Sequence, residues 1–184
     1  MKKIGTGRLE TSRLILRRFT VADAEAMYRN WASDPEVTRF LTWPCHPSVE
    51  ATAALLEDWA KQYEDGGRFS WAIQRKGANE VIGSIAAVKL DEEVNSAEIG
   101  YCLSRAFWGQ GLMPEALRAV LDYLFNEAGF NRLSARHDVR NPNSGRVMQK
   151  AGMKYEGTLR QAGKNNQGIC DLACYAALRE DPRT

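Results

Sequence analysis

The sequence predicts one α+β (mixed α/β) domain, in which a mixed, mostly antiparallel twisted sheet carries helices on both faces. Three observations predict this class: the expected elements follow the order β-α-α-β-β-β-α-β-α-β-β, one helix crosses between two strands, and the connections are short. The strands joined by that helix should be parallel neighbours, while the others should pair as hairpins. Because 184 residues can bury a substantial core, we expect residues 1–184 to form a single domain.

The first segment predicts a strand followed by a helix. Residues 14–19 are typical of a strand. Thr20, with Asp23 three residues later, has the pattern of a capping box, so a helix should follow and end near Trp31. The dipeptide Asp34-Pro35 should break it, because a residue before proline disfavours helical geometry.

A second helix should begin after Ser48 and reach about Tyr63. The glycines of Asp65-Gly66-Gly67 should end it. Its apolar side should carry Ala51, Leu55, Leu56 and Trp59. Strands are then expected at 69–75, 81–90 and 96–103, with residues 76–79 forming a hairpin turn.

Residues 107–116, Phe-Trp-Gly-Gln-Gly-Leu-Met-Pro-Glu-Ala, form the most informative stretch. Two glycines precede a helix that tolerates Pro114 in its first turn and should end near Ala128-Gly129. The core-facing stripe of this helix should be Leu117, Val120, Leu121, Leu124 and Phe125. Free N–H groups at such a helix start can bind an anion, most often phosphate. The spacing matches neither a Walker loop nor the dinucleotide fingerprint, so an ordinary tight turn is the alternative.

The C-terminal part predicts three strands and a short helix. Strands are expected at 132–139, 155–162 and 169–178, with the last two joined by a loop at 163–168. A helix should open at 141–144 and stop at Gly152.

Composition restricts the partners. The formal net charge is only +2, which predicts no strong attraction to nucleic acid. The cysteines, Cys45, Cys102, Cys170 and Cys174, have no zinc-site spacing, so no metal is expected. The apolar runs are too short for a signal peptide or a membrane span, which favours a cytoplasmic protein with no membrane partner.

Several segments resemble the GNAT superfamily of N-acetyltransferases over about residues 9–178. The glycine loop lies in the central crossover, and Asn141-Pro142-Asn143-Ser144-Gly145-Arg146-Val147-Met148-Gln149-Lys150-Ala151-Gly152-Met153 resembles that family's Asn-x-x-Ser-x-Arg-Val-x-x-Lys-x-Gly-Phe segment. The branch is similar to the ribosomal-protein alanine N-acetyltransferases (RimJ/RimL type). Further matching segments are Asp34-Pro35-Glu36-Val37, Ala97-Glu98-Ile99-Gly100-Tyr101, Tyr155-Glu156-Gly157-Thr158-Leu159-Arg160 and the segment 171–175. Trp108 and Met113 depart from the usual loop pattern, but the backbone donors that phosphate needs remain.

The resemblance implies direct acetyl transfer from acetyl-CoA to an amine. The amine must lose a proton, and the leaving thiolate, whose thiol has a pKa of about 8.5, needs a proton or hydrogen bond. Glu98 is the candidate general base, acting directly or through water; it shares a strand face with Gly100 and Cys102. A structural glutamate is the alternative. Ser144 is the candidate acid, or it only caps its helix.

The resemblance also implies a path for acetyl-CoA. The backbone of residues 101–103 should hold the pantetheine arm where the parallel strands splay, with Gly100 supplying a bulge. Asn141 should bond this arm or stabilise its own turn, and Arg146 either meets the 3′-phosphate or is solvated. The expected binding residues are Tyr101, Cys102, Leu103, Trp108, Gly109, Gln110, Gly111, Leu112, Met113, Asn141, Ser144 and Arg146.

The amine acceptor has more than one interpretation. A peptide N-terminus, such as that of a ribosomal protein, is one. A small amine (a polyamine, an aminoglycoside or an amino-acid derivative) is another, and a non-catalytic CoA-binding regulatory module is the third. Trp43 is a candidate wall of the acceptor site, with packing as the alternative. The oligomeric state stays open, a homodimer included.

Overall fold

The computed structural model describes residues 1–64 and 66–182 and confirms the fold class. One eight-stranded sheet has the order β1-β2-β3-β4-β5-β6-β8-β7, and only β5 and β6 run parallel. The strands are β1 (Leu9–Glu10), β2 (Leu14–Arg17), β3 (Ser70–Arg75), β4 (Val81–Asp91), β5 (Ser96–Leu103), β6 (Arg132–Asp138), β7 (Lys154–Asn165) and β8 (Gly168–Leu178). The α-helices are α1 (Ala24–Met27), α2 (Pro35–Thr38), α3 (Val49–Glu64), α4 (Leu112–Asn126) and α5 (Pro142–Lys150).

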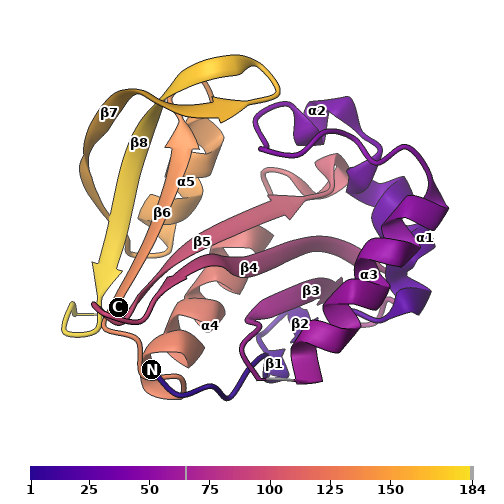
Figure 1. Ribbon diagram of the computed structural model, residues 1–184, viewed down its shortest axis with the longest axis horizontal. Coiled ribbons are helices and arrows are strands. Elements are labelled where there is room, and N and C mark those ends of the chain that lie inside the picture. The colour runs from indigo at the N-terminus through magenta and orange to yellow at the C-terminus, as the bar shows by residue number, and fades with distance from the viewer. Residues whose placement is uncertain (65, 183–184) are drawn as a thin grey trace.

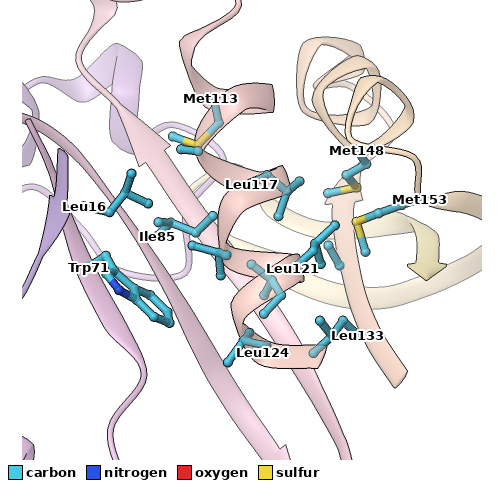
Figure 2. Close-up of a cluster of buried hydrophobic side chains, with 14 of the residues drawn as sticks. Leu16, Trp71, Ile85, Met113, Leu117, Leu121, Leu124, Leu133, Met148 and Met153 are labelled. Atoms are coloured by element: carbon cyan, nitrogen blue, oxygen red, sulfur yellow. The ribbon is translucent and has the colours of Figure 1, made fainter. Parts of the chain in front are cut away.

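Helices cover both faces of this sheet. Figure 1 shows α1 and α3 over β2 to β4, whereas α4 and α5 lie behind the strands. The α4 side holds the larger core, in which the predicted stripe of α4 is buried against β3, β4 and β6 (Figure 2). Leu117 is fully buried there. The second core packs α1 and α3 on the opposite face.

The helix expected after Thr20 is present but is not one regular helix. Asp23 accepts a hydrogen bond from the Thr20 N–H at 2.8 Å, as a capping box requires. The chain then passes from a 3₁₀ turn through α1 into a π-helical turn at Tyr28–Ala32. Asp34 then accepts the Glu36 N–H at 2.9 Å, so Asp34-Pro35 starts the short helix α2 as well as ending the one before it.

The buried side of α3 differs from the predicted one. Ala51 is exposed, and the fully buried polar residue Thr52 takes its place. Thr52 tolerates burial because its hydroxyl donates to the Ser48 carbonyl at 3.1 Å and lies 2.8 Å from the His46 ring. Asp65, expected to help end this helix, lies outside the described residues.

The closing hairpin is longer than predicted. Strands β7 and β8 continue to a tight turn at residues 166–167, so Gly163 belongs to a strand. A side chain at Gly163 would meet Leu172 at 2.8 Å, which explains a glycine within this strand. In the described part of the chain, no helix is long and apolar enough to cross a membrane.

Candidate active site

The site begins where the two parallel strands separate. Strands β5 and β6 pair only from Ser96–Arg132 to Glu98–Ser134. Beyond Glu98, β5 stays with β4 and β6 stays with β8, so the sheet opens as the sequence predicted. The predicted bulge at Gly100 is wrong: the extra residue is Val88 of β4, opposite Glu98 and Ile99. Gly100 instead makes room for Val88, because a side chain there would come within 2.9 Å of it.

A cleft of about 510 Å³ occupies this opening. It runs from the glycine loop, past the end of β5, to the start of α5, and α2 forms a further wall. Of the predicted binding residues, those that line the cleft are Tyr101, Cys102, Leu103, Trp108, Gly109, Gly111, Leu112, Met113, Asn141, Ser144 and Arg146. The fold therefore brings three segments that are distant in sequence, residues 36–41, 101–114 and 140–150, to one cavity.

The glycine loop presents an anion-binding geometry at one end of the cleft. Gly109 and Gly111 both have left-handed backbones, with φ of 77° and 73°. Among the described residues, the N–H groups of Gly109, Gln110 and Gly111 have no protein acceptor. Successive free N–H groups next to a helix N-terminus form a concave site for anionic oxygen. Arg146 and Lys150 of α5 line the same cleft and add positive charge.

Tyr101 and Ser144 meet in the middle of the cleft. The Tyr101 hydroxyl donates to the Ser144 carbonyl at 2.9 Å and lies 3.0 Å from the Ser144 hydroxyl. Burial raises the pKa of the Tyr101 phenol, which keeps it protonated. Asn141, not Ser144, stands at the N-cap of α5. The serine hydroxyl is therefore part of a pair across the opened sheet and does not cap its helix.

Glu98 lies at the point of separation but outside the lining of the cleft. Arg136 of β6 donates to its carboxylate at 2.8 Å, and the Glu98 side chain is 21% exposed. Its predicted role as a base stays a prediction.

Two other predicted residues also lie outside this lining. Gln110 turns its amide back to the Ala106 carbonyl at 3.0 Å. The Trp43 ring packs against His46, with 5.3 Å between ring centroids, while Phe40 and Leu41 of the same loop do line the cleft.

The segment that contains α2 and the loop after it is anchored to its neighbours by hydrogen bonds and an ion pair. Asn166, in the β7–β8 turn, donates through its side chain to the carbonyls of Thr38 and Trp43, each at 2.8 Å, and through its backbone to Leu41 at 3.2 Å. On the other side, Asp34 forms an ion pair of 3.1 Å with Arg105, next to the glycine loop. Residues 34–43, which we call the roof, are thus held at both ends.

Sequence reasoning missed four charged residues of the cleft: Glu36, Arg39, Arg140 and Lys150. Glu36 and Lys150 lay within segments that carried the family resemblance, which was the available signal. Arg140 also holds Asp138 with a contact of 2.6 Å, and this hydrogen bonding keeps the pKa of the Asp138 carboxyl well below its usual range. Among residues 1–64 and 66–182, no cluster of His, Cys, Asp or Glu suits a metal ion.

Comparison with known proteins decides the family. The model of the acetyltransferase (GNAT) domain matches residues 13–154. The chain belongs to the GNAT family of N-acetyltransferases. This GNAT chain is 33% identical to an uncharacterized N-acetyltransferase of Bacillus subtilis, YoaA, over 93% of its own length and 96% of the relative's.

Relatives with a named acceptor are also found. The chain is 32% identical to the ribosomal-protein-serine acetyltransferase of Escherichia coli, over 75% of this chain and 76% of that protein. A GNAT-family acetyltransferase from Bacillus anthracis has a crystal structure that superposes with a TM-score of 0.83 at 27% identity, covering 95% of this chain and all of the other. The mixed fold with one opened parallel pair is therefore that of a GNAT acyltransferase.

Proposed function

We propose that this GNAT enzyme transfers an acetyl group from acetyl-CoA to the α-amine of a peptide N-terminus, such as that of a ribosomal protein. One observation supports the transfer from acetyl-CoA above the others: a single cleft joins the free N–H groups of the glycine loop to the Tyr101–Ser144 pair. One end suits a phosphate chain and the middle suits a reacting thioester.

The residues present fit acetyl-CoA, which supplies the activated acetyl group as a thioester. The N–H groups of Gly109–Met113 would hold its pyrophosphate, while Pro114 has none to offer. Arg146 or Lys150 would meet its 3′-phosphate. Strand β6 pairs with β5 only as far as Glu98, so those backbone N–H groups of residues 101–103 that face away from β4 would hold the pantetheine arm and polarise the carbonyl.

Transfer forms a C–N bond and breaks a C–S bond, so the amine loses one proton and the departing sulfur gains one. Ser144 would donate a hydrogen bond through its hydroxyl to that sulfur, which would leave as a thiolate and then take its proton from solvent, because a thiol titrates at about 8.5. Tyr101 would then turn its own O–H toward the serine oxygen, 3.0 Å away, and support it. Because burial raises its pKa, Tyr101 stays protonated and can donate a hydrogen bond to the serine.

Glu98 would accept the amine proton through water, because its carboxylate lies beyond the cleft lining. An α-amine titrates at about 8, so a useful fraction is already neutral near pH 7 and a modest base suffices. Glu36 on the roof lines the cleft, and its carboxylate would attract the positively charged acceptor.

The deciding experiment measures acetyl-CoA-dependent release of CoA thiol with a panel of amines. The panel contains peptides with Ala or Ser N-termini, the same peptides with blocked N-termini, polyamines and aminoglycosides. Release with the free peptides alone would support the proposal. Release only with a small amine would replace the peptide by that acceptor, and bound acetyl-CoA without any release would contradict the proposed reaction for these acceptor classes.

A further inference from the structure

The β1–β2 turn reaches α4 from outside the cleft. Glu115, in the first turn of α4, accepts from the hydroxyls of Thr11 at 2.6 Å and Ser12 at 3.0 Å, and from the Arg13 N–H at 2.9 Å. The Arg13 guanidinium holds the second carboxylate oxygen at 2.6 Å. The Glu115 side chain is only 12% exposed. The turn and the helix start thus form one closed network of four residues, none of which lines the cleft.

Arg13 also forms hydrogen bonds with the backbone of the glycine loop. It donates to the carbonyls of Gln110 at 3.0 Å and Gly111 at 3.1 Å. In a trans peptide unit the carbonyl and the following N–H point in opposite directions. With both carbonyls directed at Arg13, the N–H groups of Gly111 and Leu112 must point away from it, and both of these residues line the cleft. Arg13 therefore fixes the direction of the donors that face an anion.

Arg13 also compensates the negative charge of Glu115 at the start of α4. A carboxylate in the first turn interacts favourably with the positive end of the helix dipole, as a phosphate does, but repels a phosphate bound beside it. Arg13 carries the opposite charge and forms an ion pair with Glu115 at 2.6 Å. The positive charge of Arg13 therefore reduces the repulsion between Glu115 and an anion bound at the glycine loop.

We propose that Arg13 is a positioning residue for the pyrophosphate of CoA: it aims the N–H groups of the glycine loop into the cleft and neutralises Glu115, without touching the ligand. This inference rests on the proposed use of acetyl-CoA. It makes the β1–β2 turn a part of the cofactor site, although that turn lies outside the cleft.

The test compares Arg13→Lys with wild type and with Arg8→Lys. Lysine keeps the charge near Glu115 but is a point donor that cannot hold two carbonyls and a carboxylate together. Among residues 1–64 and 66–182, Arg8 pairs with Glu10 at an exposed position, and it serves as the matched control. Calorimetry should show CoA binding to Arg13→Lys weakened about tenfold, with Arg8→Lys unchanged.

A second substrate separates positioning from general damage. S-acetylpantetheine has the thioester but no pyrophosphate, so its turnover by Arg13→Lys should stay within about twofold of wild type. Equal losses with acetyl-CoA and S-acetylpantetheine would overturn the inference, since they indicate a damaged fold. Wild-type affinity of Arg13→Lys for CoA, in an enzyme that still acetylates, would overturn this inference alone. A wild-type protein that does not bind CoA would overturn the proposed function and this inference with it.

Discussion

At the scale of single residues, the two hydroxyls that face each other across the opened sheet carry the most specific chemistry. Replacing Tyr101 by Phe keeps the ring but removes the bond to Ser144, so kcat should fall about tenfold while the KM for acetyl-CoA stays within about twofold. Steady-state kinetics from pH 6 to pH 9 measure this. The shape of the pH profile should not change, because Tyr101 positions the serine and does not titrate in that range.

A double-mutant comparison shows whether the two hydroxyls act together. Ser144→Ala should lower kcat about 10–100-fold, and adding Tyr101→Phe should then cost little more. Tyr175→Phe is the control, because that hydroxyl accepts from Gln149 at 3.2 Å and does not line the cleft. Additive losses for Tyr101 and Ser144 would contradict a shared role.

Glu98 remains a prediction that kinetics can decide. If this carboxylate receives the amine proton, Glu98→Gln should lower kcat by about tenfold or more near pH 7 without weakening CoA binding. Because the change also breaks the ion pair with Arg136, the control is Glu156→Gln, which breaks the corresponding pair with Arg132. Full activity of Glu98→Gln would remove Glu98 from the mechanism.

Sequence analysis found site residues that belong to a local pattern and missed roles that depend on contacts between distant segments. Ser144 and Asn141 could be found because their segment has a local pattern. Tyr101 was expected to act through its backbone, because nothing local shows that its side chain crosses to a helix 43 positions away. Arg13 and Glu115, 102 positions apart, are linked in the same non-local way.

At the scale of elements, the roof and the β7–β8 turn form one wall of the site. Asn166→Ala removes the two side-chain bonds to the roof, so the roof should loosen. We expect the KM for the acceptor to rise about fivefold to tenfold, while CoA affinity is unchanged. Gln167→Ala, next to it in the same exposed turn, is the matched control. A change in CoA affinity instead of acceptor KM would show that the roof serves the other end of the cleft.

Elements with strong local signals were predicted closely. Strand β5 matches the predicted range, and α4 begins after the glycines as expected. The predictions failed where tertiary contacts outweigh local preference. Burial of Thr52 depends on a hydroxyl that finds partners at Ser48 and His46, and the length of β7 depends on pairing with β8 across residues typical of a loop.

At the scale of the whole molecule, ion pairs between distant segments should make stability depend on acid pH. Burial opposes ionisation of Glu115, but the hydrogen bonds from Thr11, Arg13 and Ser12 outweigh it and lower its pKa to about 2. Arg140 lowers the pKa of Asp138 in the same direction. The folded state therefore favours the ionised carboxylates, whose unfolded pKa values are about 4. Their stabilising contribution is complete above the unfolded pKa and is lost as pH falls through the folded pKa.

Thermal unfolding should accordingly give a Tm that is steady above about pH 5 and falls steeply toward pH 2. Glu115→Gln should be less stable than wild type by about 1–2 kcal/mol at pH 7, and this difference should shrink as the pH approaches 2. Glu57→Gln, at an exposed position of α3, should show no such pH-dependent difference. A difference between Glu115→Gln and wild type that is equally large at pH 3 and pH 7 would mean that packing, and not the ionised carboxylate, holds the β1–β2 turn to α4. The glycine loop would then lose the electrostatic part of its support, and only the two carbonyl contacts of Arg13 would remain to orient it.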